Sequence, residues 1–443
     1  MTSAPLPDGP PGGDPESVVD LLRFAAVGSV DDGKSTLIGR LLFDTRLLFD
    51  DQLEAVAEAS RRRGVGTVDL SFVTDGLRAE REQGITIDVA YRYAATPTRK
   101  FVIADCPGHV QYTRNMATGA STADLALVVV DATVGLREQT RRHTCIASLL
   151  GVDQLLVCAN KMDLTGWDPD AYARVADEMA VLAHRLGVAS CTVVPVSALH
   201  GDNVVDRSDA APWYEGPTVL EALEAAPAGR WAAAHGQHRG TGARLPVQWV
   251  LRHPGGGRSY AGMVNGGPLH RGDEVVVLPD GRRTTVSTIE RFDGPLDVAP
   301  VGLSVSVRLA DDLDVSRGDL IAAADEPPLV TSEFEATVCW FGERALRGGD
   351  RLRLKHTTRV TACRIGTVES VLDVNGLLLQ PAVELADNEI GVVRLLTASP
   401  LALDSYRRDR ITGSFVLVDE ATNATVAAGM VGPPELVERS RSS

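Results

Sequence analysis

The residues best suited to bind phosphate lie near the N-terminus, in a stretch that fits the pattern G-x-x-x-x-G-K-[ST]. They are Gly28, Ser29, Val30, Asp31, Asp32, Gly33, Lys34, Ser35 and Thr36. The two glycines allow a sharp turn, so that backbone N–H groups at the start of a following helix can approach phosphate oxygens. Lys34 is expected to reach the β- and γ-phosphates of a nucleotide, and the Ser35 hydroxyl is expected to bind Mg²⁺. The alternative is a chance match in a chain with 42 glycines.

The distribution of lysine favours the phosphate-binding interpretation. The chain has 44 lysine and arginine residues, and only four of them are lysines. They are Lys34, Lys100, Lys161 and Lys355. Because arginine is used at nearly every other cationic position, a lysine at position 34 indicates a site where a bulky guanidinium would not substitute.

A second motif, D-x-x-G, could act on the terminal phosphate. Its residues are Asp105, Cys106, Pro107 and Gly108, and His109 follows it. Asp105 at a strand end can hold the hydration shell of Mg²⁺, and Gly108 can donate its N–H to a γ-phosphate. His109 then lies where it could orient the attacking water, so the predicted catalytic residues are Lys34 and His109. The alternative for Asp105 is a turn that begins with Asp before Pro-Gly.

The tetrapeptide Gly84-Ile85-Thr86-Ile87 supplies a further candidate ligand for Mg²⁺. Thr86 could bind the ion when a γ-phosphate is present and so order the preceding loop. The predicted metal ligands are therefore Ser35, Thr86 and Asp105, which all offer oxygen atoms. The alternative for the tetrapeptide is the plain start of a strand.

Another pair of motifs indicates which base is bound. The first consists of Asn160, Lys161, Met162 and Asp163, and the second of Ser197, Ala198 and Leu199. A buried Asp163 carboxylate can accept hydrogen bonds from guanine N1–H and the exocyclic amine, a donor pair that adenine lacks. Asn160 can bond the guanine edge, the Lys161 stem can lie over the ring, and the second motif can offer a backbone N–H. Taken alone, N-K-x-D could also be an ordinary polar loop.

Alternating strands and helices must position these loops. Apolar runs predict strands at 21–27, 87–94, 100–104, 124–130, 154–159 and 191–196. Helical patterns occur at 34–43, 112–119, 138–150, 169–186 and 217–225. This alternation over residues 17–228 predicts an α/β P-loop domain with a mainly parallel sheet and helices on both faces. The motifs then lie at the carboxyl ends of the strands, where such sheets bind ligands.

The sequence pattern changes beyond a linker near residues 227–244. Short strands with turns at close spacing are predicted at 246–251, 260–264, 273–278, 284–289, 334–340, 350–355, 391–396 and 414–418. We expect two β-barrel domains, at 244–326 and 331–432. Residues 1–16 are rich in proline and glycine and lack an apolar core, which predicts a disordered tail rather than a signal peptide.

Composition narrows the possible partners. The net charge is −15, which disfavours general nucleic-acid binding. The six cysteines are scattered without a C-x-x-C pair, which is typical of a reduced cytosolic protein without a zinc site. No apolar run reaches membrane-spanning length, so we expect a cytoplasmic protein without membrane contact.

In this order the motifs resemble those of the translation-factor class of GTPases. Longer stretches, at 28–36, 75–93 and 111–121, resemble one branch, the GTPase subunits of bacterial sulfate adenylyltransferase (ATP sulfurylase). The stretches 202–204 and 212–218 also resemble this branch, and the likeness covers roughly residues 20 to 432. Elongation factors usually carry His in the region of Asp31 and Asp32. Two positions depart from the branch, since Cys106 stands where it usually has Thr and Val110 where it usually has Glu.

The resemblance implies an elongation-factor-Tu-like fold, with GTP and Mg²⁺ as cofactors. It implies that a separate small catalytic subunit converts ATP and sulfate to adenosine 5′-phosphosulfate and pyrophosphate. GTP hydrolysis on this chain would drive that uphill reaction. Some relatives carry a fused kinase, and we expect none here because there is no second phosphate loop up to residue 443. The alternatives are a translation-elongation-type GTPase that delivers aminoacyl-tRNA and a GTP switch module with another client.

Overall fold

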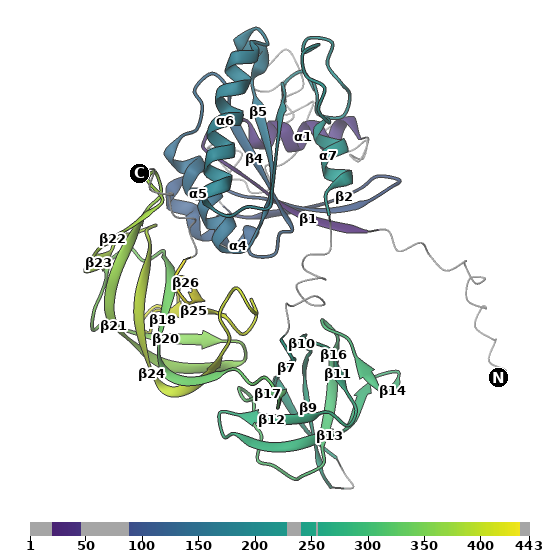
Figure 1. Ribbon diagram of the computed structural model, residues 1–443, viewed down its shortest axis with the longest axis vertical. Helices are drawn as coiled ribbons and strands as arrows, with labels where there is room; N and C mark the ends of the chain where they lie inside the picture. The colour runs from purple at the N-terminus through teal and green to yellow at the C-terminus, as the bar shows by residue number, and fades with distance from the viewer. Residues whose placement is uncertain (1–19, 46–87, 228–240, 254–255, 435–443) are drawn as a thin grey trace, which may run out of the picture.

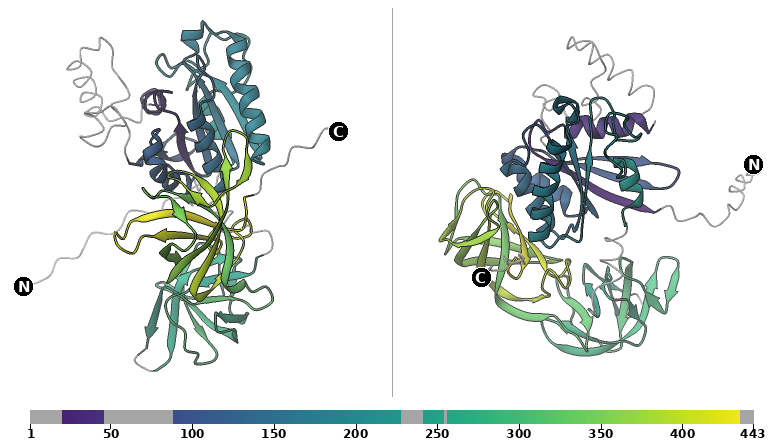
Figure 2. Two further views of the ribbon diagram at one scale, coloured as in Figure 1. Left: turned by 90° about the vertical axis from the view of Figure 1, so that its left-hand side faces the viewer. Right: turned by 45° about the horizontal axis from the view of Figure 1, so that its top comes forward.

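The computed structural model describes residues 20–45, 88–227, 241–253 and 256–434. Within these ranges the chain forms an α/β domain and then two bodies built of strands (Figure 1). The predictions for Thr86 and for the tail at 1–16 lie outside the described residues. The second strand body contacts both the α/β domain and the first strand body, and the two views of Figure 2 show it beside each of them.

The α/β domain is built on one six-stranded sheet. Its strands are β1 (Leu21–Gly28), β2 (Ala90–Ala95), β3 (Lys100–Asp105), β4 (Leu125–Asp131), β5 (Gln154–Asn160) and β6 (Ser190–Pro195). Their order is β2-β3-β1-β4-β5-β6, and every pair is parallel except β2 with β3. This confirms the predicted mainly parallel sheet. Because β3 and β4 flank β1, the loop after β1 leaves the sheet at its centre.

Helices cover both faces of this sheet, as predicted (Figure 1). They are α1 (Lys34–Asp44), α4 (Thr113–Ala120), α5 (Glu138–Leu149), α6 (Pro169–Arg185) and α7 (Val219–Ala225). Apolar residues of α1 and α7 pack with Leu22 and Phe24 in one core cluster. Those of α4, α5 and α6 pack with Val128 and Val157 in a second cluster on the other face. Burial of these apolar stripes fixes the helices that carry the candidate site residues.

The first strand body is a β-barrel. Its strands are β7 (Ala243–Pro246), β8 (Trp249–Arg252), β9 (Arg258–Met263), β10 (Asn265–Gly266), β11 (Leu269–His270), β12 (Glu274–Leu278), β13 (Arg282–Arg291), β14 (Gly294–Leu296), β15 (Val298–Ala299), β16 (Ser304–Leu309) and β17 (Leu320–Ala323). The ladder runs β7-β17-β12-β13-β16-β9. It closes because β10, which directly continues β9, pairs with β7.

One strand prediction in this barrel is wrong. The stretch predicted as a single strand at 246–251 forms the end of β7 and most of β8. Pro246 has no N–H with which to continue the ladder. The next two N–H groups then bond different strand neighbours, from Val247 to Asp319 O at 2.8 Å and from Gln248 to Ala261 O at 2.8 Å. The chain therefore changes partners between the two strands.

The second strand body is also a barrel. Its strands are β18 (Leu329–Trp340), β19 (Leu346–Arg347), β20 (Arg351–His356), β21 (Arg359–Asp373), β22 (Leu378–Pro381), β23 (Glu384–Leu385), β24 (Ile390–Leu403), β25 (Ser414–Val418) and β26 (Thr425–Val431). The ladder β20-β25-β26-β18-β24-β21 closes through the pairing of β21 with β20. The fold is thus an α/β domain followed by two β-barrels, as the sequence predicted.

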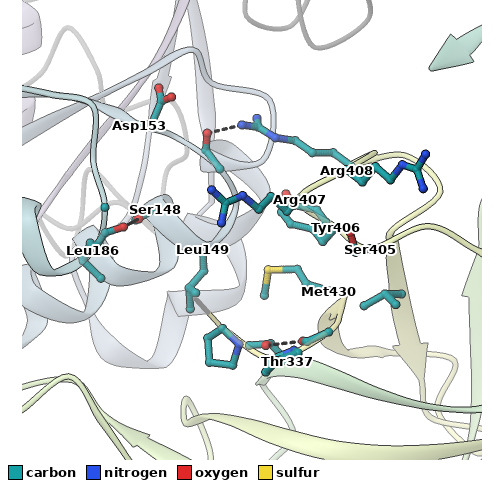
Figure 3. A pocket seen from close by; sticks show the side chains of 17 residues that line it. Ser148, Leu149, Asp153, Leu186, Thr337, Ser405, Tyr406, Arg407, Arg408 and Met430 are labelled. Carbon is teal, nitrogen blue, oxygen red and sulfur yellow. Dashed lines mark hydrogen bonds between the residues drawn. The ribbon is translucent and has the colours of Figure 1, made fainter. Parts of the chain in front are cut away.

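The second barrel is joined to the α/β domain by packing and by hydrogen bonds. Cys339 and Met430 belong to the same core cluster as the buried residues of α5. The Tyr406 hydroxyl donates to Leu150 O at 2.9 Å, directly after α5. A cavity of about 700 Å³ lies beside this contact, and Figure 3 shows Tyr406 and Met430 on its barrel side with Leu149 on its helix side. The end of α5 therefore rests on the second barrel.

A buried ion pair joins the two barrels. Arg244 of β7 is fully buried, and its Nε lies 3.0 Å from Asp404 Oδ2, just after β24. We expect Arg244→Met to lower the free energy of unfolding of the barrels by about 3–5 kcal/mol, because it leaves the Asp404 carboxylate buried without its cation. Urea denaturation followed by tryptophan fluorescence measures this. Arg394→Met is the control, since Arg394 pairs with the exposed Glu333 and the partly exposed Glu369 and should cost at most about 1 kcal/mol. Equal losses of unfolding free energy in Arg244→Met and Arg394→Met would contradict a stabilising role for the buried ion pair.

Three further observations concern the described parts of the chain. In those parts, no helix is long and apolar enough to cross a membrane. All six cysteines are free thiols. Within the same ranges, no three His, Cys, Asp or Glu side chains gather as a metal-binding cluster of the kind that zinc requires.

Candidate nucleotide site

The loop between β1 and α1 has the backbone geometry that the phosphate motif requires. Gly28 and Gly33 have φ angles of 150° and 94°. A Cβ on Gly28 would lie 2.5 Å from Val129 O, and one on Gly33 would collide with the Asn160 side-chain amide. Gly33 is also the residue before α1, and no side chain caps that helix. The first N–H groups of α1 are thus left to an anion, which is the chemistry of a phosphate site.

Lys34 lies beneath this loop and is only 7% exposed. Its Nζ donates to Ser29 O at 2.6 Å and to Gly28 O at 3.3 Å. Burial lowers the pKa of the Lys34 ammonium, and the Asp105 carboxylate opposes that shift most strongly. A Cβ on Gly108 would lie 2.5 Å from Lys34 Nζ, so the D-x-x-G loop rests directly on the lysine. The fold therefore brings the first two predicted motifs together.

The Asp32 carboxylate connects the phosphate loop to α5 through hydrogen bonds and an ion-pair contact. The Asp32 carboxylate is 1% exposed and accepts the Ser29 N–H at 2.9 Å. The Thr140 hydroxyl of α5 lies 2.8 Å from Ser29 Oγ and donates to Asp32 Oδ2 at 3.5 Å. Arg137 donates to Val30 O at 3.1 Å and lies 3.8 Å from Asp32 Oδ1. Burial raises the pKa of the Asp32 carboxyl, and the Ser29 N–H offsets part of that rise.

His143, one turn beyond Thr140, supports the same loop. Its Nδ1 lies 3.2 Å from Gly28 O, and its Nε2 lies 2.6 Å from Gln139 Nε2. A neutral ring satisfies both contacts when Nδ1–H donates and Nε2 accepts. Burial lowers the pKa of His143 to about 3, so the ring is neutral at pH 7. His143 can thus hold the loop in place but cannot shuttle protons at that pH.

Thr140→Val removes the hydroxyl that joins α5 to the loop while keeping the shape of the side chain. Because Ser29 and Asp32 lose a buried partner at a cost of about 1–3 kcal/mol, we expect GTP affinity to fall roughly tenfold. Titration with a fluorescent GTP analogue measures this. Thr140→Ser restores the hydroxyl and should bind within about twofold of the unaltered protein. Equal affinity in Thr140→Val would contradict a role for Thr140 in holding the loop.

The predicted base motif also meets the phosphate loop. Asn160 is 3% exposed, donates to Asp32 O at 2.8 Å and accepts the Ala198 N–H at 2.9 Å. Lys161 lies 2.7 Å from Asp131 Oδ2, which holds its side chain across the loop. The Asp163 side chain is 20% exposed. The two base motifs and the phosphate loop thus form one site, with Asn160 at their junction.

Some predicted residues lie at the edge of the site or point away from it. Met162 is fully buried in the core cluster beneath the sheet, so only its backbone can face a nucleotide. Leu199 is 59% exposed, and Ser197 is fully buried. Cys106 is also fully buried, and a Cβ on Gly119 would lie 2.5 Å from its sulfur. The small Cys106 side chain therefore fits the loop, as expected.

The described residues include suitable oxygen donors for Mg²⁺. The Ser35 side chain lies in the first turn of α1. Asp105 is fully buried at the end of β3, within electrostatic reach of Lys34. A hydroxyl and a carboxylate are hard donors of the kind that Mg²⁺ prefers. His109 is half-buried after the same loop, with its ring edge-on to Tyr112 at a centroid distance of 6.2 Å.

Sequence reasoning missed the supporting residues of this site. Thr140 and His143 lie on the predicted helix 138–150, but their partners are more than 100 residues away in the sequence. Asp131 ends the predicted strand 124–130, one residue beyond its assigned limit. A buried Thr and His three residues apart on one helix were the available signal, because polar groups buried together need partners.

Two family models match the chain. The elongation factor Tu GTP binding domain matches residues 20–227. A domain like the C-terminal domain of GTP-eEF1A matches residues 333–432. The chain is also similar to a solved structure of Sup35 with GMPPNP, at 24% identity and a TM-score of 0.41 over 93% of this chain and 94% of that one.

Relatives of high identity span nearly the whole chain. The bifunctional enzyme CysN/CysC of Mycobacterium tuberculosis strain H37Rv is 54% identical over 93% of this chain and 67% of its own length. The sulfate adenylyltransferase subunit 1 of Chromobacterium violaceum is 48% identical over 93% of this chain and 86% of its own length. That of Aeromonas hydrophila is 48% identical over the same shares. The chain therefore belongs to the sulfate adenylyltransferase subunit 1 family, and it begins with a GTP-binding domain of the elongation factor Tu type.

Proposed function

We propose that this chain hydrolyses GTP and thereby drives the synthesis of adenosine 5′-phosphosulfate and pyrophosphate from ATP and sulfate. The synthesis itself would take place on a separate, small catalytic subunit. The observation that carries this proposal is the 48% identity to sulfate adenylyltransferase subunit 1 proteins over 93% of the chain. The packed phosphate and base motifs add support, because a chain without GTP chemistry has no need of them.

Different residues of the site have different roles in GTP hydrolysis. The N–H groups of the phosphate loop and the Lys34 ammonium bind the phosphates and stabilise charge on them as the terminal group leaves. His109, next to Gly108, orients the attacking water. Asp163 reads the guanine edge, and Lys161 lies against the base. Ser35, Thr86 and Asp105 would hold Mg²⁺, which when bound would neutralise phosphate charge.

A physical path runs from the D-x-x-G loop to the second barrel. The loop continues through a 3₁₀ turn at Val110–Tyr112 into α4. Arg114 of α4 donates to Thr425 O of the barrel at 3.3 Å. Loss of the γ-phosphate would release Gly108, and α4 would carry the movement to the barrel and the partner. We place the complex in the cytoplasm, because six free cysteines suit a reducing compartment.

The amount of adenosine 5′-phosphosulfate formed at equilibrium tests the proposal. The purified chain is mixed with the small subunit, ATP, sulfate and Mg²⁺, with or without GTP. Because the synthesis is uphill, product should rise well above its GTP-free level only when GTP is hydrolysed. A non-hydrolysable GTP analogue should give the GTP-free level. Equal product with and without GTP would contradict the coupling.

A further inference from the structure

Arg40 on α1 connects the helix of the phosphate loop to the second base motif. Its Nη2 donates to Leu199 O at 2.5 Å, and its Nε donates to Ala198 O at 3.4 Å. Asp44, one turn further along α1, accepts from Arg40 Nη1 at 3.3 Å. The carboxylate contact and the two carbonyl contacts together fix the guanidinium plane, since arginine presents its donors in a rigid fork.

These contacts act on the opposite side of the loop from the base-reading residues. The Ala198 N–H points to Asn160, while the Ala198 carbonyl points to Arg40. Gly201 makes room for this arrangement, because a Cβ there would lie 3.3 Å from Arg40 Cδ and its φ is 89°. The Ala198 N–H is thus held by Asn160, and the Ala198 and Leu199 carbonyls are turned towards α1. In the planar trans peptide between Ala198 and Leu199 the N–H belongs to Leu199 and points opposite to the carbonyl, so that donor faces away from α1.

This orientation matters at position 6 of a purine. Guanine carries a carbonyl there, which accepts a hydrogen bond from a peptide N–H. A 6-amino purine carries a donor, which would pair with a peptide carbonyl instead. A flip of a peptide between Ala198 and Leu199 would thus invert the preference. The bond from Arg40 to Ala198 O opposes a flip of that peptide directly, and the shorter bond to Leu199 O holds the next peptide in place. Both bonds have a charged donor, which strengthens a hydrogen bond.

We propose that Arg40 is a positioning residue that determines specificity for 6-oxo purines by holding the carbonyls of Ala198 and Leu199 away from the base. The inference rests on the proposed use of GTP and adds a determinant outside the guanine motif itself. It differs from a role in general stability, because its effect is confined to one position of the purine ring. Asp163 reads the 2-amino group and N1, so the two residues control separate parts of the base.

Three nucleotides test these roles: ITP lacks only the 2-amino group of GTP, and the 2,6-diaminopurine analogue has an amino group in place of the 6-carbonyl and no hydrogen on N1. The affinities of GTP, ITP and 2,6-diaminopurine riboside triphosphate are measured by competition with a fluorescent GTP analogue. In Arg40→Met, which keeps the stem but removes the donors, we expect the preference for GTP over the 6-amino analogue to fall about tenfold. The preference for GTP over ITP should stay within twofold, because those two differ only in the 2-amino group. In Arg40→Lys, which has a single charged centre, the preference for GTP over the 6-amino analogue should lie between that of Arg40→Met and that of the unaltered protein. This variant provides the test if Arg40→Met does not fold.

Arg141→Met is the matched control. Arg141 also lies on a helix of the α/β domain and pairs with Glu178 at 2.7 Å, away from the base motifs. Both preferences should be unchanged in this variant. An unchanged preference at position 6 in Arg40→Met, or an equal loss of both preferences, would overturn the inference while leaving GTP use intact. If the unaltered protein did not prefer GTP to ATP, the proposed function would fall, and the inference with it.

Discussion

Lys34→Ala is expected to lower the rate of GTP hydrolysis by at least about 100-fold. The Lys34 ammonium is buried beneath the phosphate loop and donates to the Ser29 and Gly28 carbonyls. We propose that from this position it stabilises charge on the β- and γ-phosphates. Release of phosphate from GTP, measured under single-turnover conditions, separates this loss from any change in product release.

Lys100→Ala is the matched control for Lys34. Lys100 begins β3, is exposed and lies outside every nucleotide motif. Its removal should leave turnover within about twofold. Lys34→Arg should be as inactive as Lys34→Ala, because a Cβ on Gly108 would already lie 2.5 Å from the ammonium, so the space around Lys34 Nζ does not admit a guanidinium. Turnover by Lys34→Ala at the normal rate would remove the phosphate-loop assignment.

Asp163→Asn is expected to weaken GTP binding by roughly 100-fold and to favour xanthine nucleotides. The amide that replaces the carboxylate carries an NH₂ donor group, which would face the 2-amino group of guanine, itself a donor. Xanthine carries a carbonyl at that position, and the amide can donate to it. The affinities of GTP and XTP, measured side by side, show whether the preference has reversed.

Asp177→Asn serves as the control for Asp163. Asp177 is an exposed carboxylate on α6, in the same domain but away from the base motifs. Its substitution changes the net charge by the same amount and should leave both affinities unchanged. Retained preference for GTP in Asp163→Asn would show that the base is read elsewhere.

The fold was largely predictable because its local patterns and its tertiary structure agree. The apolar runs of β1, β4 and β5 are fully or mostly buried, as a parallel sheet covered on both faces requires. The failure at 246–251 arose where one proline interrupts an otherwise regular apolar run. Sequence periodicity cannot show that Val247 and Gln248 bond different neighbours, because those bonds depend on residues 72 and 13 positions away. The limits of the three domains stay a prediction.

The candidate site, like the fold, could be predicted from the sequence only in part. Motif residues such as Gly33, Lys34 and Asn160 could be found from the sequence, because nucleotide chemistry fixes their types and spacing. The residues that hold those motifs in place, Thr140 and Arg40, carry no such signature. Their partners lie more than 100 residues away, so only the fold brings them together. The catalytic roles of Lys34 and His109 and the binding of Mg²⁺ by Thr86 stay predictions.

Mutual dependence of the two reactions tests the central claim most directly. GDP and pyrophosphate are measured in the same sample of the chain and the small adenylyltransferase subunit, and ATP, sulfate and GTP are omitted one at a time. Coupling predicts that GDP forms faster when ATP and sulfate are both present, and that pyrophosphate forms in quantity only with GTP. If GDP instead forms at one slow rate whatever else is present, the chain is a GTPase with a different client.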